Sequence, residues 1–232
     1  MQDTDHARTE ILKVRGARKI TAQRMRASLQ ETAQVTLTRY AVATNLVSFR
    51  SGLKAQSAKN PEDVCPTLND IIMHCVSRVL EAHTEINALF TPEGIERHSA
   101  VNLGFAVDTG RSLLVPVIHG ANELSLKELA HRSKELIDLA KTGKITADAM
   151  TGGTFTVSNL GGLGIHWFTP VLNAPEVGIL GIGAMHTFFP GGAPQIPLSL
   201  TFDHQALDGA AAATVLGAFA SAIEDAGLTA TV

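Results

Sequence analysis

The chain has 232 residues, 45% of them hydrophobic, and a formal net charge of −3, so it can bury a sizeable core and lacks the overall basic character of nucleic-acid-binding proteins. Its longest apolar runs have strand length, well short of a membrane span, and the polar N-terminus lacks the apolar stretch of a signal peptide. Cys65 and Cys75 form neither a CxxC pair nor a metal-ligand spacing, so we expect reduced thiols, no metal site and a cytoplasmic location.

Helical and strand patterns alternate through the first third of the chain. Residues 1–12 are predicted to be a flexible tail. Residues 16–32 predict an amphipathic helix with Ile20, Met25 and Leu29 on or near one face. The next expected elements are a strand over 34–44, a helix over 46–58 and an apolar helix over 68–83 that begins after Thr67.

The central and C-terminal parts continue this alternation. A short extended segment and two strands are expected at 85–89, 101–107 and 113–118. Ser125 is placed to cap a long helix that ends near Gly143. Later strands are expected at 155–157, 177–182 and 196–202, and a final helix at 210–224. The chain is therefore predicted to be α/β, and no linker rich in Pro, Ala or Ser divides it.

The stretch DHQALDG near the C-terminus combines a buried strand end with two polar side chains. The expected strand ends at Asp203, which places His204 at its tip. Four residues later, Asp208 precedes Gly209 and an alanine-rich helix. A base held between a strand and a helix sits on rigid elements and can face a cleft, so we identify His204 as a candidate general base. Asp208 can also act as the N-cap of the helix, and the two roles are compatible.

Four stretches in the same order resemble one known family: GARKITAQRM, VNLGFAVDTGRSLLVPVI, GGTFTVSNLGGLGIHWFTPVLNAPEVGILGIG and DHQALDG. Over residues 13–225 the chain resembles the catalytic, inner-core (E2) domain of the dihydrolipoamide acyltransferases of 2-oxo acid dehydrogenase complexes. The resemblance implies the fold shared with chloramphenicol acetyltransferase, in which a mixed β-sheet is flanked by helices. It also implies a single catalytic domain over residues 13–232, preceded by the tail.

The resemblance assigns roles to individual residues. His204 resembles the family's general base, Asp208 the acidic residue that steadies the active site, and Ser158 the hydroxyl that stabilises the tetrahedral intermediate. The family's usual pattern is DHRxxDG, and Gln205 replaces its arginine here, which removes a charge beside the base. Weaker candidates for substrate contacts are Asn159, His166, Trp167 and Phe168. Ser158 and the loop aromatics also suit ordinary packing roles.

The implied reaction moves an acyl group between dihydrolipoamide and coenzyme A, which are both substrates. Only a thiolate attacks well and a free thiol has a pKa of about 8.5, so a neutral imidazole that accepts the thiol proton assists the attack. A hydroxyl aimed at the developing oxyanion is worth roughly 3–4 kcal/mol in comparable sites. No acyl-enzyme is required because coenzyme A itself attacks, and the sequence has no GxSxG elbow.

The resemblance also implies partners. In the family the histidine and serine face each other across a subunit boundary, so we expect a homotrimer with an intersubunit active site. A lipoyl domain, either missing from this chain or supplied in trans, and the E1 dehydrogenase and E3 dihydrolipoamide dehydrogenase are the expected partners, without nucleic acid or membrane. The C-terminal EDAGLTATV has Leu228 as its only large apolar residue before Val232, so we expect a trimer rather than a cubic or dodecahedral core.

Two other functions fit parts of the sequence. One is a non-catalytic core or scaffold subunit, which the retained His204, Ser158 and Asp208 disfavour. The other is a small-molecule acetyltransferase of the chloramphenicol acetyltransferase type, which the DH pair and FTVSN disfavour.

An acetyl or branched-chain acyl group is favoured over succinyl, since no obvious added cationic residue lies near FTVSN or HWFTP to pair with a succinyl carboxylate, although His166 could serve. A solvated helix face is the expected role of Arg15, Arg18, Lys19 and Arg24, and a contact between one of these arginines and the acidic active-site region is the weaker alternative.

Overall fold

The protein is represented by a computed structural model that describes residues 10–58 and 64–227. Most of the expected tail at 1–12, and the C-terminal segment with Leu228, lie outside the described residues. The expectations placed on those segments therefore stay predictions. Among the described residues, no helix combines the length and the hydropathy that crossing a bilayer requires.

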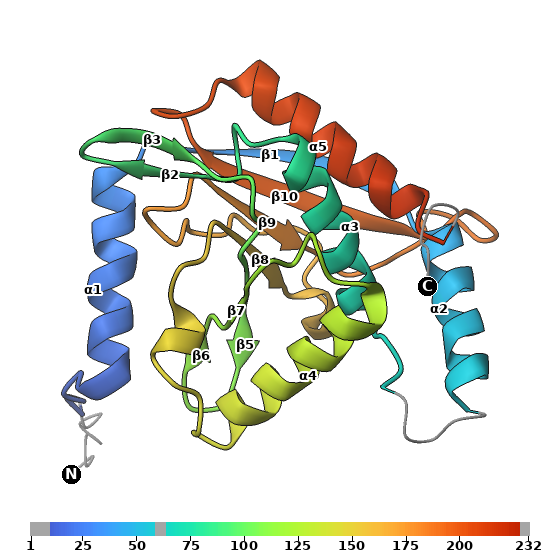
Figure 1. Cartoon of the computed structure of the whole chain (residues 1–232), viewed down its shortest axis with the longest axis horizontal. Helices are drawn as coiled ribbons and strands as arrows, with labels where there is room; N and C mark the ends of the chain where they lie inside the picture. Colours follow the sequence, from blue (N-terminus) through green and yellow to red (C-terminus); the bar gives the residue numbers. More distant parts are fainter. Residues whose placement is uncertain (1–9, 59–63, 228–232) are drawn as a thin grey trace, which may run out of the picture.

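A six-stranded mixed sheet forms the centre of the fold, with the strand order β1-β10-β9-β8-β4-β7 (Figure 1). β4, β8 and β9 run parallel to one another, whereas β1, β10 and β7 pair antiparallel with their neighbours. The strands are β1 (Gln34–Val42), β10 (Gln195–Asp203), β9 (Gly178–Ile182), β8 (Phe155–Asn159), β4 (Leu103–Phe105) and β7 (Val117–Ile118). The predicted α/β class with a mixed sheet is confirmed.

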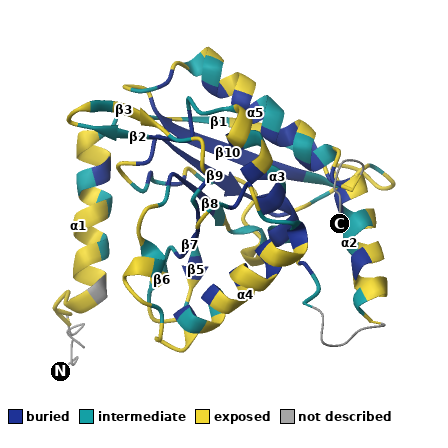
Figure 2. Cartoon of the chain, viewed as in Figure 1, coloured by how far each residue is buried: buried dark blue, intermediate teal, exposed yellow. Residues whose placement is uncertain are grey.

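Helices flank this sheet. They are α1 (Gly16–Glu31), α2 (Thr44–Ser57), α3 (Leu68–Ala82), α4 (Leu126–Lys141) and α5 (Gly209–Glu224), with two short 3-10 helices, η1 (Asp148–Met150) and η2 (Gly161–Leu163). α5 packs along β1 and against α3, and α4 packs against α3. α1 and α2 stand at opposite ends of the molecule, and the buried residues concentrate in the strands and the facing sides of α3 and α5 (Figure 2).

The predicted helix starts at Thr67 and Ser125 are confirmed by reciprocal capping. Each hydroxyl accepts a hydrogen bond from the backbone N–H three residues later, and Asp70 or Glu128 at that position accepts from the cap residue's own N–H. The Ser133 hydroxyl of α4 also donates to Asp70 Oδ1 over 2.5 Å. The cap of α3 therefore also ties α3 to α4.

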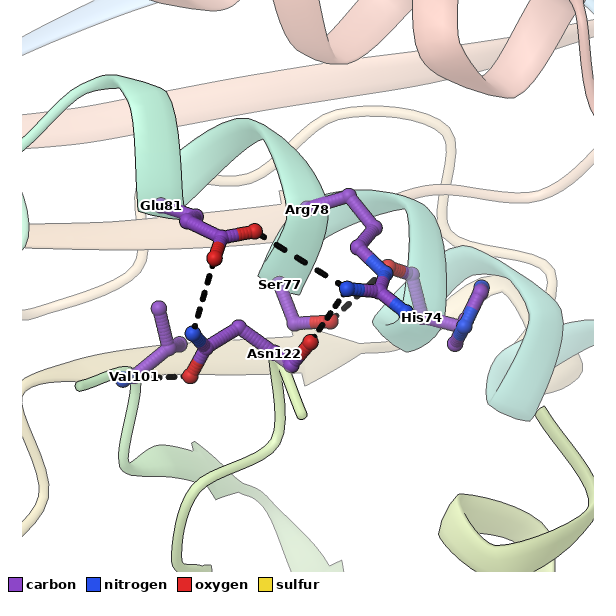
Figure 3. Close-up of polar contacts among 6 residues, drawn as sticks. All are labelled: His74, Ser77, Arg78, Glu81, Val101 and Asn122. Carbon is purple, nitrogen blue, oxygen red and sulfur yellow. Dashed lines mark hydrogen bonds and ion pairs between the residues drawn. The ribbon is translucent and has the colours of Figure 1, made fainter. Parts of the chain in front are cut away.

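A polar network fastens α3 to the segment that precedes β4 (Figure 3). Arg78 donates to the carbonyl of Asn122, and the Asn122 amide donates to Glu81 over 3.3 Å. The Asn122 side-chain oxygen accepts from the backbone N–H of Val101 at 2.9 Å. These contacts connect α3, the segment that follows β7 and the residue two positions before β4.

Helix α1 forms as predicted, but its predicted apolar face is wrong. Ile20 and Leu29 are 56% and 57% exposed, and only Met25 is half-buried. The inward stripe instead includes Thr21 and Ser28, and the buried Ser28 hydroxyl donates to the carbonyl of Leu172 over 2.7 Å. Helix α1 is thus held by polar contacts at its C-terminal half and leaves its apolar side chains outside.

The two long strands expected at 101–107 and 113–118 are each broken in two. Their outer parts are β4 and β7 in the main sheet, and their inner parts are β5 (Val107–Asp108) and β6 (Leu113–Leu114), which pair only with each other. Pro116 lies at the break and has no N–H to donate to a ladder. The segment expected at 85–89 is displaced into a hairpin of β2 (Ala88–Thr91) and β3 (Gly94–Arg97).

Candidate active site

His204 follows directly after the last residue of β10, as predicted. Its backbone N–H donates to the carbonyl of Ala33 over 2.9 Å. The Ala33 N–H donates in return to Asp203 Oδ1 over 3.0 Å. Two hydrogen bonds therefore clamp residues 203 and 204 to the connection between α1 and β1, which fixes the backbone beneath the imidazole.

The His204 imidazole lies at the surface of the chain, and its side chain is 43% exposed. The ring contacts Phe202, with 5.6 Å between the ring centroids, and its Nδ1 lies 4.0 Å from Asp208 Oδ1, too far for a hydrogen bond. Asp208 occupies the N-cap position of α5, but its side chain makes no capping hydrogen bond and is 91% exposed. The capping role considered for the Asp208 side chain is therefore absent, and its carboxylate is free beside the imidazole.

Gln205 takes over the contacts expected of an arginine but without its charge. The buried carboxylate of Asp203 accepts from the Gln205 backbone N–H at 3.0 Å and from its side-chain Nε2 at 3.2 Å to each oxygen. The same Nε2 donates to the carbonyl of Glu31, near the end of α1, over 2.8 Å. Gln205 thus joins the end of α1 to the end of β10, and neutral donors hold Asp203.

Ser158 is the penultimate residue of β8 and lines a cleft with a volume of about 560 Å³. The other walls are α1, through Arg18 and Thr21, and the β5–β6 hairpin, through residues 106–113. Within the described part of the chain, the Ser158 hydroxyl has no hydrogen-bond partner. It is therefore available to donate to a group that enters the cleft.

His204 and Ser158 are far apart within one chain. Ser158 pairs with Gly181 of β9, which pairs in turn with Ser199 of β10. With a rise of about 3.3 Å per residue and about 4.8 Å between strands, His204 and Ser158 lie roughly 19 Å apart. His204 also does not line the Ser158 cleft. The two predicted catalytic side chains therefore cannot act on the same atom within a single chain.

The weaker candidates divide into two groups. Asn159 lines the Ser158 cleft, whereas His166, Trp167 and Phe168 do not. Trp167 Nε1 donates to the hydroxyl of Tyr40 over 3.1 Å, and the His166 ring stacks on His186 with 4.5 Å between the centroids. Phe168 covers Gly181, where an added Cβ would stand 2.8 Å from its ring. His166 and Trp167 therefore pack with Tyr40 and His186, whereas Phe168 covers the residue of β9 that pairs with Ser158.

Sequence reasoning missed one cation of the cleft, Arg111, and expected the other, Arg18, on a solvated helix face, with a contact to the active-site region as the weaker alternative. Arg18 of α1 and Arg111 of the β5–β6 hairpin line the cleft that holds Ser158. The expectation that no cationic residue lies near FTVSN was therefore wrong for this cleft. Arg111 is 47 positions from Ser158 in the sequence, and only the parallel pairing of β4 with β8 brings the hairpin there.

A second basic cleft of about 460 Å³ lies between α2 and α3. Its lining includes Arg50, Lys54 and Asn69. Asn69 Oδ1 accepts a hydrogen bond of 2.9 Å from Nδ2 of Asn159, the residue after Ser158. Asn159, the last residue of β8, thus lines one basic cleft and bonds to a residue that lines the other.

Glu176 is a buried carboxyl that sequence reasoning did not single out. Burial raises its pKa from 4.5 to about 7, against the opposing effect of hydrogen bonds from Thr156 and Asn173. Those hydrogen bonds are 2.5 Å and 2.8 Å long. Glu176 lies at a cleft of about 310 Å³ under α1, apart from both Ser158 and His204.

His74 and Cys75 lie in α3, where core packing was expected. Burial lowers the pKa of His74 and raises that of the Cys75 thiol to about 12, which keeps both side chains uncharged at neutral pH. Cys65 and Cys75 are both free thiols. Across residues 10–58 and 64–227, no group of three or more His, Cys, Asp and Glu side chains could hold a metal ion.

Comparisons with known proteins identify the family of the chain. The model for the catalytic domain of the 2-oxoacid dehydrogenases acyltransferase family matches residues 6–230. The chain is 39% identical over 218 residues to the dihydrolipoyllysine-residue acetyltransferase component of the acetoin cleaving system of Bacillus subtilis, which covers 91% of this chain and 54% of that protein. The first curated relatives are covered over only about a third to a half of their length.

Solved structures give the same picture. The dihydrolipoamide acetyltransferase (E2p) of Azotobacter vinelandii superposes with a TM-score of 0.87 at 34% identity, covering 97% of this chain and 96% of that chain. That structure was used to study the catalytic roles of a serine, a histidine and an asparagine, the last two spaced like His204 and Asp208. A chloramphenicol acetyltransferase shares the fold, with a TM-score of 0.54 at 15% identity over 83% of this chain and 84% of that chain.

Proposed function

The chain belongs to the family of 2-oxoacid dehydrogenase acyltransferases, as their catalytic domain, and we propose that it moves an acetyl group between a dihydrolipoyl thiol and coenzyme A. The observation that carries the proposal is a pair of side chains. The His204 imidazole lies at the tip of β10 on a hydrogen-bonded backbone, and the Ser158 hydroxyl lines a cleft and has no hydrogen-bond partner among the described residues. The acetyl group follows the names of the relatives.

In the proposed reaction His204 accepts the proton of the attacking thiol as sulfur bonds to the thioester carbonyl. The negative charge moves to the carbonyl oxygen, where the Ser158 hydroxyl donates a hydrogen bond. The tetrahedral intermediate then collapses and the carbon–sulfur bond of the original thioester breaks. His204 returns the proton to the sulfur that leaves. Asp208 faces His204 and stabilises the positive charge that the imidazole acquires.

The active site is proposed to form between copies of the chain. The separation of roughly 19 Å within one chain supports this, because a second copy must bring its His204 to the Ser158 cleft. A homotrimer closes three such sites. Lipoylated protein, the E1 dehydrogenase and the E3 dihydrolipoamide dehydrogenase are the proposed partners, and the lipoyl group and coenzyme A act as substrates. The basic cleft at Arg50 and Lys54 is the proposed place for the phosphates of coenzyme A.

The direct test is transfer from acetyl-CoA to free dihydrolipoamide by the purified chain. Replacing Ser158 with alanine is expected to lower kcat by about 10²–10³-fold and to leave KM nearly unchanged, because the lost hydrogen bond forms mainly in the transition state. Ser112→Ala removes another hydroxyl from the same cleft and serves as the matched control. A wild-type protein without transfer would favour the scaffold function, and a Ser158→Ala variant with normal kcat would remove Ser158 from the mechanism.

Gln205 offers a second test of how His204 is held. Replacing Gln205 with alanine is expected to lower kcat about tenfold, because the buried Asp203 loses a donor and the connection to Glu31 is cut. Gln205→Arg should restore kcat, since a guanidinium can donate to both acceptors. Gln56→Ala, an exposed position on α2, is the control. Steady-state kinetics and thermal denaturation separate the outcomes, and a lower Tm with wild-type kcat would make Gln205 purely structural.

A further inference from the structure

Positive charge is concentrated in the segment that enters and forms α1. Residues 13–31 contain six cationic residues and one anionic residue, a net charge of +5. The whole chain has a net charge of −3, which leaves −8 for the rest. The cations are Lys13, Arg15, Arg18, Lys19, Arg24 and Arg26, and all six are exposed. The last four lie on α1, which stands at one side of the molecule, and the first two directly precede it (Figure 2).

These cations have no partners within the described residues. None of the six side chains forms an ion pair or donates a hydrogen bond there, and the same holds for Arg111 on the β5–β6 hairpin. Exposed charges that pair with nothing contribute little to stability. Six in one short segment of an otherwise acidic chain create a local positive field that favours an acidic partner.

The field is located at the mouth of the Ser158 cleft. Arg18 and Arg111 line the cleft from opposite walls, α1 and the β5–β6 hairpin. Arg15 and Lys19 flank Arg18 along the chain without lining the cleft. We call these four residues the basic rim. A group that enters the cleft to reach Ser158 contacts walls that carry Arg18 and Arg111, with Arg15 and Lys19 close to Arg18 in the sequence.

We propose that the basic rim docks an acidic surface of the protein domain that carries the dihydrolipoyl-lysine. The inference rests on the proposed function, in which one substrate is a modified lysine residue and therefore part of a protein. A thiol on a lysine-borne arm brings the surface of its carrier to the cleft mouth when it reaches Ser158. The cleft proposed for the phosphates of coenzyme A is a separate one at Arg50 and Lys54, on the other side of the hydrogen bond between Asn159 and Asn69. The rim therefore serves the protein-borne substrate through charge complementarity.

The test compares two acceptors of the acetyl group, free dihydrolipoamide and a purified, reduced lipoyl domain of net negative charge. The double variant Arg15→Glu with Lys19→Glu is expected to raise KM for the lipoyl domain about tenfold at low ionic strength. KM for acetyl-CoA and kcat/KM for free dihydrolipoamide should change less than about twofold, because neither position lines the cleft. Added salt should raise KM for the lipoyl domain in the wild type and shrink the difference between the proteins.

Lys134→Glu with Lys144→Glu, two exposed positions in and after α4, makes the same change in net charge away from the rim. This control should keep the wild-type KM for the lipoyl domain. An unchanged KM for the lipoyl domain in the rim variant overturns the proposal, and so does a raised KM for acetyl-CoA, which would assign the rim to coenzyme A. Failure of the proposed function is distinguishable, because the wild type would then transfer nothing to free dihydrolipoamide either.

Discussion

Replacing His204 with alanine is expected to lower kcat for acetyl transfer by about 10²–10⁴-fold. In the proposed reaction the imidazole accepts the thiol proton, and its partial exposure means that its loss leaves no core cavity. Tm should therefore stay near the wild-type value. The residual rate of the variant should rise with pH up to the pKa of the thiol, about 8.5, because only preformed thiolate can then attack. A pH–rate profile of both proteins checks this result.

The same variant tests whether the site forms between chains. His204→Ala and Ser158→Ala are each expected to be nearly inactive alone. When equal amounts are unfolded, mixed and refolded together, random assembly into rings should give about one quarter of the sites an intact serine and an intact histidine. Recovery of activity to about that fraction supports an active site shared between subunits. Mixed assemblies that stay as inactive as the parents would place both residues in one chain and contradict the separation along the sheet.

The second large effect is expected on stability, from Glu176. Its pKa is raised to about 7 in the folded chain from 4.5, so the folded state retains a proton that the unfolded chain releases first. The free energy of unfolding therefore falls as pH rises from 4.5 to 7, because the buried carboxyl must lose its proton. Above pH 7 the whole loss of unfolding free energy from this group, about 3 kcal/mol, is present. Glu176→Gln keeps the shape and an acceptor for Asn173 without the charge, and should be more stable than the wild type at pH 8.

Denaturant unfolding at pH 5 and pH 8, at one protein concentration, measures this effect. The difference in unfolding free energy between Glu176→Gln and the wild type should be small at pH 5 and large at pH 8. Glu93→Gln changes an exposed glutamate in the turn between β2 and β3 and should show neither effect. A difference that is the same at both pH values would mean that Glu176 does not titrate in this range.

Local signals in the sequence predicted those parts of the fold that depend on local chemistry. The starts of α3 and α4 follow from Thr67 and Ser125 because a capping hydroxyl acts within one turn. The position of His204 follows from an apolar run that ends abruptly, and β10 is indeed buried along almost its whole length. These features need no knowledge of which strands become neighbours.

The features that were missed depend on distant pairing. Arg111 joins the Ser158 cleft only because β4 pairs with β8 and Pro116 lets the hairpin leave the sheet. The inner stripe of α1 is polar because it bonds to the segment near Leu172, which no periodicity along the helix reveals. Glu176 is buried by elements from four parts of the chain, so its sequence neighbours do not indicate its altered pKa. Sequence alone therefore predicted where individual elements begin and end better than which residues surround a buried or cleft-lining side chain.

The distance between His204 and Ser158 along the sheet has a consequence for how the protein behaves before assembly. In the proposed mechanism, a newly folded, solitary chain holds His204 and Ser158 at opposite ends of the two strands that flank β9, so we expect it to be inactive. Specific activity then depends on protein concentration, falling on dilution as the subunits separate and returning on concentration. We therefore expect unassembled chains to leave acetyl-CoA intact and transfer to begin only where neighbouring subunits meet.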